Sequence, residues 1–313
     1  MLCASRRTGS LKNYSAQPSP SIGARHGDGL DGSAVNSTAF TRLGPAEPEH
    51  PVVLSVPHAG RDYPLALRAA ARLPLASLLV LEDRLVDHVA LAARRGETML
   101  VASRPRAWID LNRGEDERDP LLDEGAPANT PDTHRLRSGL GLVPRRAGAA
   151  GDVWRRRLSA AEVERRIVED HRPYHAELAR LLAAARARFG VAVLLDIHSM
   201  PPLGPVGRAP QLVFGDRFGR TADARLAARL EAVGTAAGLI VATNSPYAGG
   251  HVVTRHAAPE AGIHALQVEL DRRLYLDTRL ERAGPGLGAT ARLLRRMIDA
   301  AADSVLPTAL AAE

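Results

Sequence analysis

The sequence predicts an α/β protein whose central sheet is covered by helices on both faces. Apolar runs of about four to eight residues recur along the chain, and each has the length of a buried strand. Amphipathic segments with helical spacing lie between these runs, as expected for strands and helices that alternate in a layered sheet. Of the 313 residues, 45% are hydrophobic, which is enough to bury a sizeable core.

The strands are predicted from these apolar runs, in chain order. The first, VVLSV at 52–56, leads into Pro57, His58 and Gly60, which are typical of a loop. The longest, VAVLLDI at 191–197, is followed by a histidine, a serine and two prolines. The other predicted strands are ETMLVAS at 97–103, AWIDLN at 107–112, QLVFG at 211–215, LIVATN at 239–244 and HALQVEL at 264–270.

The helices are predicted from periodicity and from boundary residues. Segment 81–96 has helical spacing and is closed by a glycine. Ser159 and Glu162 match a capping box, which opens a long helix that ends at Gly190. Two further helices are predicted, at 221–237 and 286–302. Residues 114–152 form a long loop rich in Gly, Pro and Asp, and a loop of this length in a compact domain is usually functional or disordered.

Residues 1–48 are predicted to be a disordered or loosely attached extension, because Ser, Gly, Asn and Pro are frequent and apolar periodicity is weak. Residues 49–313 are predicted to form a single domain. No apolar run approaches the roughly 20 residues of a membrane helix, and the N-terminus lacks the apolar block of a secretory signal. One cysteine, Cys3, excludes an internal disulfide framework. We therefore expect a cytoplasmic protein with no membrane partner, and the sequence leaves its oligomeric state open.

The net charge of +6 at pH 7 does not predict a nucleic-acid partner. Lys12 is the single lysine, and every other Lys or Arg position is arginine. The arginines stand beside glutamates on predicted helices, as in VERRIVEDHR, rather than in one basic block. Solvated helix faces therefore explain the charge better than a nucleic-acid surface does.

Polar residues recur where the predicted strands end, and this is where open α/β sheets bind their ligands. His58 follows the strand at 52–56, and His198 follows the strand at 191–197. A single histidine after a strand is usually a hydrogen-bonded turn residue, but two at the ends of two buried strands suit a metal site. Asp196 is costly to bury without a partner, and the second ring nitrogen of a metal-bound histidine is a natural one.

A catalytic zinc ion needs three protein ligands and one position left for water. His58 and His198 supply two ligands, and the adjacent Glu82 and Asp83 are both candidates for the third. Glu269 is the candidate base, because a metal lowers the pKa of its water and a free carboxylate can then take the proton. Glu269 also stands in an alternating run, where it could simply face solvent.

Other catalytic plans have less support. Cys3 lies in the predicted extension, which argues against a cysteine nucleophile. The sequence contains no G-x-S-x-G elbow, no P-loop and no G-x-G-x-x-G at a strand–helix junction.

A set of motifs resembles the N-formylglutamate amidohydrolase family in chain order. The motifs are SVPHAG with Tyr63-Pro64, ED..VD at 82–87, SRPRAWIDLNR, RPYH, LLDIHSMPP, YAGGHVVTRH and LQVELDRRLY, and they cover about residues 50–280. The resemblance implies a three-layer α/β/α sandwich with a central mixed sheet, phosphorylase/hydrolase-like and similar to zinc carboxypeptidases. It also implies a metal-hydrolase domain at 49–313 that cleaves N-formyl-L-glutamate to formate and L-glutamate in histidine breakdown.

The resemblance also carries site residues over to this chain. It places His58, Asp83 and His198 at metal-ligand positions, favouring Asp83 over Glu82, and it makes Glu269 the general base. The implied ion is Zn²⁺, although iron, cobalt or manganese would suit the same ligands. The implied substrate-binding residues are Arg104, Asn112, Arg113, His175 and Arg255, with the Asn112–Arg113 pair gripping a carboxylate.

The chain departs from the family pattern at two places. His251 stands where an aromatic residue is expected, and GEDERDP follows DLNR in place of an apolar, proline-rich continuation. Two alternatives stay open. One is an enzyme for another N-acyl amino acid or small carboxylate-bearing amide, and the other is a non-catalytic binding protein on the same fold.

Overall fold

A mixed sheet forms the centre of the fold in the computed structural model, which describes residues 35–36, 39–130 and 133–305. The strand order is β1-β2-β4-β3-β5-β8-β6-β7. The strands β4, β3, β5 and β8 run parallel, whereas β2 pairs antiparallel with β4 and β6 pairs antiparallel with β8. The strand bounds are β1 Val35–Asn36, β2 Phe40–Leu43, β3 Val52–Val56, β4 Met99–Ala102, β5 Ala192–Met200, β6 Leu212–Gly215, β7 Val241–Thr243 and β8 Ile263–Asp271.

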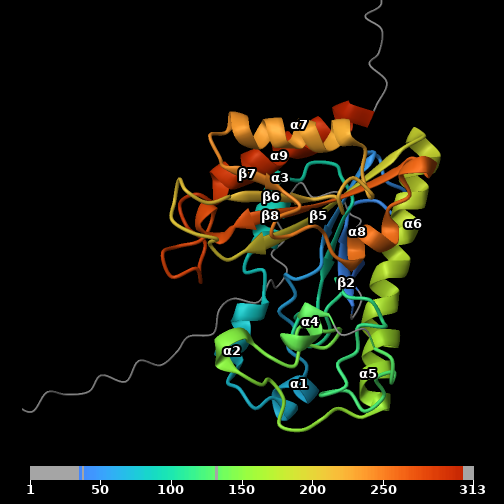
Figure 1. Cartoon of the computed structure of the whole chain (residues 1–313). Helices are drawn as coiled ribbons and strands as arrows, with labels where there is room; N and C mark the ends of the chain where they lie inside the picture. Colours follow the sequence, from blue (N-terminus) through green and yellow to red (C-terminus); the bar gives the residue numbers. More distant parts are fainter. Residues whose placement is uncertain (1–34, 37–38, 131–132, 306–313) are drawn as a thin grey trace, which may run out of the picture. The chain divides into compact units, whose positions relative to one another are not determined.

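Helices cover both faces of this sheet (Figure 1). The helices α6 and α8 pack on one face, and α3, α7 and α9 pack on the other. This confirms the predicted α/β/α sandwich with a central mixed sheet. The helix bounds are α1 Leu65–Ala70, α2 Leu75–Leu78, α3 Val86–Ala93, α4 His134–Arg137, α5 Ala160–Arg166, α6 Arg172–Phe189, α7 Ala224–Ala236, α8 His251–His256 and α9 Leu287–Val305.

Alternation along the central strands creates two apolar cores, one on each face. Val53 of β3 and Leu194 of β5 point into the core beneath α6. Their chain neighbours Leu54 and Val193 point into the core beneath α3, α7 and α9. Successive side chains of a strand point to opposite faces, so a run that is apolar at every position is buried on both sides. The parallel centre of the sheet is therefore rigidly held, and the site lies at the carboxyl ends of its strands.

The sheet begins earlier in the chain than the sequence predicts. Phe40–Leu43 was expected within the extension, yet it forms β2 beside β4. Phe40 packs edge-to-face on Tyr174 of α6, and Arg42 donates a hydrogen bond to Glu177 at 2.7 Å. The run FTRL is too short and too polar to be recognised as a strand from the sequence. Its contacts are with β4 and α6, which lie in distant parts of the chain. Residues 1–34 and 37–38 of the predicted extension lie outside the described residues.

The predicted strand at 107–112 is wrong, because these residues form successive turns instead. The Asp110 carboxylate accepts the backbone N–H of Asn112 at 2.8 Å, an arrangement that stabilises a turn. Carbonyls that a strand would present to a neighbour are bound instead by side chains, among them the Leu111 carbonyl by His175. The segment is therefore buried without joining the sheet.

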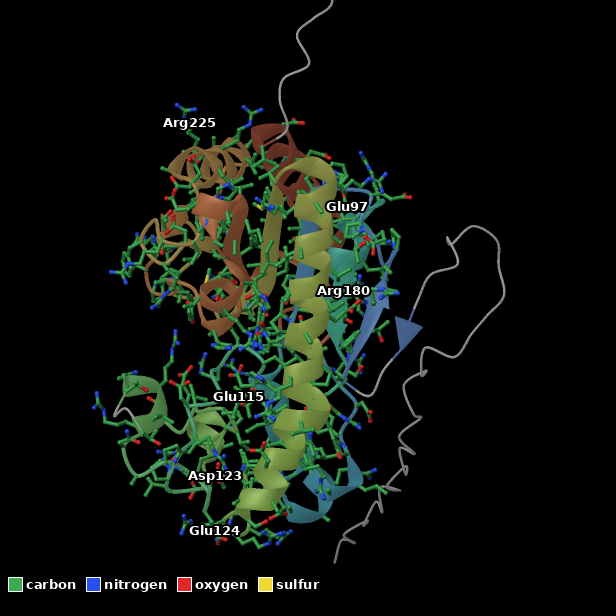
Figure 2. The ribbon with its side chains drawn as sticks, turned by 90° about the vertical axis from the view of Figure 1, so that its right-hand side faces the viewer. Glu97, Glu115, Asp123, Glu124, Arg180 and Arg225 are labelled. Carbon is green, nitrogen blue, oxygen red and sulfur yellow. The ribbon has the colours of Figure 1, made fainter. Side chains whose placement is uncertain are left out.

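The long loop that follows packs beside α5 and α6. Figure 2 shows its residues Glu115, Asp123 and Glu124 next to these helices, in the lower part of the view. Arg172 of α6 donates to Glu115 at 2.8 Å, so the loop is tied to the helix. Short regular segments, α4 among them, interrupt the loop.

The long predicted helix at 159–189 is present with one local change. The capping box of Ser159 and Glu162 opens α5 as predicted. A π-helical turn, Ile167–His171, then separates α5 from α6, and Gly190 ends α6 in a left-handed conformation. In the described part of the chain, no helix combines the length and the apolar character that a membrane crossing requires.

Candidate active site

Three buried side chains converge at the carboxyl ends of β3 and β5. His58 lies two residues beyond the end of β3, His198 lies near the end of β5, and Asp83 lies just before α3. His198 Nδ1 is 3.1 Å from His58 Nδ1 and 3.0 Å from Asp83 Oδ2, and His58 Nδ1 is 3.5 Å from Asp83 Oδ2. In a tetrahedral site with ligand bonds of about 2.0–2.1 Å, neighbouring ligand atoms are about 3.3 Å apart. The triangle therefore has the dimensions of a divalent-metal site.

The second nitrogen of each histidine in this triangle is bound to a carboxylate. His58 Nε2–H donates to Asp110 Oδ1 at 2.7 Å, and His198 Nε2–H donates to Asp196 Oδ2 at 2.8 Å. Ser55 donates to the other oxygen of Asp196 at 2.7 Å. These bonds turn each Nδ1 into the triangle, which is the usual orientation of metal-ligating histidines. Asp196 therefore lies within hydrogen-bond distance of His198, and its orienting role stays a prediction.

Asp83, and not Glu82, supplies the carboxylate of the triangle. Glu82 points away and accepts hydrogen bonds from Tyr63 at 2.6 Å and Arg84 at 2.9 Å. Although burial acts to raise the pKa of Asp83, the hydrogen bonds from His198 and His58 outweigh it and lower that pKa. Asp83 is therefore ionised at neutral pH, as a metal ligand must be.

Glu269 lies directly across from His198. The two residues are register partners on the parallel strands β5 and β8, so their side chains share one face of the sheet. Gln267 donates to Glu269 Oε1 at 2.7 Å. Burial raises the pKa of Glu269 to about 7, although the His198 charge acts to lower it. A carboxylate beside the triangle with a pKa near neutrality is suited to accept and return a proton.

The triangle and Glu269 form part of the wall of a cavity of about 440 Å³. Ser199, Tyr247 and Gln267 add polar groups to this wall. The positive charge of the wall comes from Arg106, Arg113, Arg135 and Arg272. A cavity of this size admits a small molecule, and its arginines favour one that carries carboxylates.

Arg113 is a buried arginine of the cavity wall that has no hydrogen bond to a carboxylate among the described residues. Its Nε donates to the Leu140 carbonyl at 3.0 Å and its Nη1 to the Asn112 carbonyl at 2.7 Å. The nearest carboxylates, of Asp110 and Glu117, are 3.9 Å from its Nε. Burial lowers the pKa of Arg113 to about 10, so it remains protonated at pH 7.

Asn112 also lines the cavity, but internal hydrogen bonds occupy its amide. Its Nδ2 donates to Gln267 at 3.2 Å, and its Oδ1 accepts the Val252 backbone N–H at 2.9 Å. Gly250 allows this packing, since a Cβ there would lie 2.3 Å from Asn112 Oδ1. The amide therefore fixes the wall around its neighbour Arg113.

The structure does not bring the other three predicted substrate-binding residues to the cavity. Arg104 pairs with Asp62, outside the cavity wall. His175 is buried behind the wall, where it binds the Leu111 carbonyl, and Arg255 is exposed on α8. The motifs that contain these residues occur in the order expected for the family. The order of motifs in the sequence does not determine which way a side chain points.

Three residues that line or support the cavity, namely Arg106, Asp110 and Arg272, had no role assigned to them from the sequence. Asp110 orients His58 and also accepts from Arg106 Nε at 2.7 Å. Arg272 donates to the Glu82 carbonyl at 2.6 Å and lies 3.4 Å from Asp83 Oδ1. All three residues lie inside motifs quoted above, so the motifs indicated the right region. Their roles depend on contacts between positions far apart in the sequence, which the motifs do not reveal.

Comparisons with known proteins place similar sequences in one family. The family model described as N-formylglutamate amidohydrolase matches residues 50–276. An N-formylglutamate deformylase of Pseudomonas aeruginosa is 34% identical over 231 residues, which is 72% of this chain and 82% of that protein. One of Pseudomonas putida is 30% identical over 233 residues, with the same coverage.

Solved structures give the same result. The crystal structure of N-formylglutamate amidohydrolase from Ralstonia eutropha JMP134 has a TM-score of 0.78 and 32% identity, over 86% of this chain and 98% of that one. A gene product of Agrobacterium tumefaciens, with a TM-score of 0.60 and 22% identity over 85% of this chain and 94% of that one, shares the fold. The family model spans most of the chain and includes the whole metal-site triangle, Glu269 and Arg113. This chain therefore belongs to the N-formylglutamate amidohydrolase family.

Proposed function

We propose that this protein is a metal-dependent amide hydrolase that cleaves N-formyl-L-glutamate to formate and L-glutamate. The observation that supports this most strongly is the triangle of His58, Asp83 and His198 with Glu269 beside it, in an arginine-lined cavity. The similarity to curated N-formylglutamate deformylases supports the choice of substrate. Histidine breakdown is the pathway that we expect from the resemblance to the N-formylglutamate amidohydrolase family.

The proposed metal ligands are His58 Nδ1, Asp83 Oδ2 and His198 Nδ1, held in place by Asp110 and Asp196. Two imidazoles and one carboxylate suit Zn²⁺, and Fe²⁺, Co²⁺ or Mn²⁺ would be accepted by the same atoms. When bound there, the ion would polarise the formyl carbonyl and lower the pKa of a water molecule.

Glu269 is the proposed general base and acid. It takes a proton from the water that attacks the formyl carbon, and it then delivers a proton to the amide nitrogen. The C–N bond breaks, so that formate and the free amino group of glutamate are released. Glu269 is suited to both transfers because its raised pKa, about 7, allows it to gain and lose a proton near neutral pH.

Arg113 is the proposed partner of a substrate carboxylate. Carbonyls hold its Nε and Nη1, so the guanidinium is oriented while its charge remains available to an anion. An arginine fork can form two parallel hydrogen bonds with a carboxylate, and both the charge and the direction then favour an acidic acyl amino acid.

Formate release tests the proposal. The tag-free protein is assayed with N-formyl-L-glutamate before and after chelation, and again after Zn²⁺, Co²⁺, Mn²⁺ or Fe²⁺ is returned. We expect activity to disappear on chelation and to return with at least one ion. An unchanged rate after complete metal removal would refute the metal-dependent mechanism.

A substrate panel tests the choice of acyl amino acid. N-formyl-L-aspartate, N-acetyl-L-glutamate and N-formyl-L-glutamine vary the side-chain length, the acyl group and the side-chain carboxylate in turn. We expect N-formyl-L-glutamate to have the highest kcat/KM. A better substrate in the panel would identify a related amidohydrolase, and binding without turnover of any member would identify a binding protein.

A further inference from the structure

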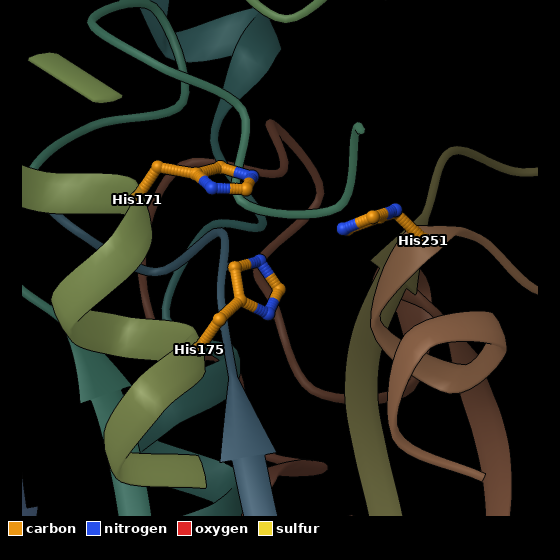
Figure 3. Close-up of side chains that lie close together, drawn as sticks. All are labelled: His171, His175 and His251. Atoms are coloured by element: carbon orange, nitrogen blue, oxygen red, sulfur yellow. The ribbon is translucent and has the colours of Figure 1, made fainter. Parts of the chain in front are cut away.

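A second group of histidines lies outside the cavity wall, on the far side of the Leu111–Arg113 segment. His171 ends the π-helical turn, His175 lies in the first turn of α6, and His251 begins α8. Figure 3 shows the three rings converging from these two helical segments. One nitrogen from each ring lies within 4.8 Å of the others. The spacing of four between His171 and His175 places both rings on one side of the helix.

Hydrogen bonds determine which nitrogens of this group carry protons. His171 Nε2 is 2.8 Å from the Arg113 carbonyl, and His175 Nε2 is 2.9 Å from the Leu111 carbonyl. A carbonyl only accepts hydrogen bonds, so both Nε2 atoms must carry the proton and both Nδ1 atoms keep a lone pair. Metal-ligating histidines commonly donate their other N–H to a carbonyl in this way.

Two nitrogens of the group are buried without any hydrogen-bond partner among the described residues. They are His171 Nδ1 and His251 Nε2. His175 Nδ1 accepts from His256 Nε2 at 2.9 Å. A buried nitrogen without a partner is costly, and the cost disappears if a ligand occupies the space between the rings.

The imidazoles of the group are neutral at physiological pH. Burial lowers the pKa of His171, and burial together with the neighbouring imidazoles lowers the pKa of His175. Burial also lowers the pKa of His251 to about 4 and that of His256 to about 3. Neutral imidazole is the form that binds a metal, so no protons need to be displaced at pH 7.

We propose that His171, His175 and His251 bind a divalent transition-metal ion at a second site, separate from the His58–Asp83–His198 triangle. Three nitrogen ligands select Zn²⁺, Co²⁺, Ni²⁺ or Cu²⁺ over Mg²⁺ and Ca²⁺, which prefer oxygen. Ring rotations bring the nitrogens from within 4.8 Å to the spacing of about 3.3 Å that a tetrahedral ion requires. The ion replaces the His256 N–H at His175 Nδ1.

The surroundings provide a further ligand and a route from solvent. Glu115, marked in Figure 2, has its Oε1 3.8 Å from His171 Nδ1. His251 also lines a separate cavity of about 260 Å³, whose wall carries the carboxylates of Asp116 and Glu117 and the guanidinium groups of Arg135 and Arg217. An ion can reach His251 through this cavity.

The bound ion has a structural role. It joins the π-helical turn and α6 to α8, two segments that the sequence separates by more than one strand. The same histidines hold the carbonyls of Leu111 and Arg113. Metal binding therefore stiffens the segment that places Arg113 in the cavity wall, without the ion taking part in amide cleavage.

Metal stoichiometry tests this proposal independently of activity. Tag-free protein is stripped with chelator, equilibrated with excess Zn²⁺ or Co²⁺ by dialysis, and analysed for bound metal by mass spectrometry. We expect about two equivalents for the wild type, one for His198→Ala, one for His251→Phe and none for the double variant. His88→Phe, which removes an exposed imidazole outside both groups, is the matched control and should retain two.

The pattern separates the two sites. One equivalent in the wild type that His198→Ala abolishes would overturn the second site and leave the triangle as the metal centre. One equivalent that His251→Phe abolishes and His198→Ala retains would support the second site and contradict the metal-dependent function. Circular dichroism checks that each variant folds. The proposal is also refuted, whatever the variants do, if the wild type binds only one equivalent and its Co²⁺ spectrum locates that ion at the triangle.

Discussion

Asp196→Asn isolates the contribution of a buried carboxylate that lies outside the proposed set of metal ligands. Asp196 is fully buried, and its Oδ2 accepts from His198 Nε2 at 2.8 Å. An asparagine can keep its oxygen at that position, and its amide can donate to Ser55, whose hydroxyl then turns to Tyr174 at 2.9 Å. The substitution therefore removes the charge and retains the shape.

The expected magnitude follows from the hydrogen bond that loses its charge. Bonds to charged groups contribute about 1.5–3 kcal/mol and neutral ones about 0.5–1.5 kcal/mol, so the difference is about 1–1.5 kcal/mol. That difference corresponds to roughly a tenfold loss of metal affinity, at the lower end of the 10–100-fold typical of such orienting partners. Competition between the protein and a chromophoric chelator measures the dissociation constant directly.

Asp123→Asn provides the matched control. Asp123 is also a buried carboxylate, but it pairs with Arg118 within the long loop beside α5 and is no part of the triangle. We expect this control to leave metal affinity unchanged. Equal affinity in Asp196→Asn and the wild type, or equal weakening in both variants, would refute the idea that Asp196 acts through His198.

Three further predictions concern the base, the substrate carboxylate and the edge of the sheet. Glu269→Gln should retain the metal and substrate binding yet lower kcat by on the order of 10²–10⁴-fold, and normal turnover would exclude it as the base. Arg113→Lys should cost about 1.5–3 kcal/mol of substrate binding, seen as a raised KM, and an equal loss with a substrate lacking that carboxylate would contradict the assignment. Deletion of residues 1–48, expected from sequence alone to be harmless, should lower Tm because it removes β2 and the buried side chain of Phe40, worth about 1.5–3 kcal/mol. An unchanged Tm in a thermal melt would show that β2 contributes little.

Local patterns in the sequence determined most of the elements and the place of the site. Largely apolar runs marked β3 and β5, because strands buried on both faces are rich in apolar residues, and an alternating run marked β8. The polar residues that interrupt or follow these runs marked the carboxyl edge of the sheet. The sequence thus sufficed to name His58, His198 and Glu269 as candidates, and it narrowed the candidate third ligand to two adjacent residues.

Contacts between distant segments were decided by the tertiary structure. His58 is 52 positions from Asp110, and His198 is 115 positions from Asp83, so no local pattern links them. The 107–112 segment is apolar enough for a strand, yet His175 of α6 and His58 bind its polar groups and hold it in turns.

The second histidine group depends on tertiary structure in the same way. His171 and His175 share one side of a helix, which the sequence implies, but His251 joins them only because α8 packs against α6. Periodicity encodes which face of an element is buried, whereas the partner of that face depends on how the whole chain packs. The sequence therefore determined the elements and the edge at which chemistry occurs, and packing decided which side chains meet there.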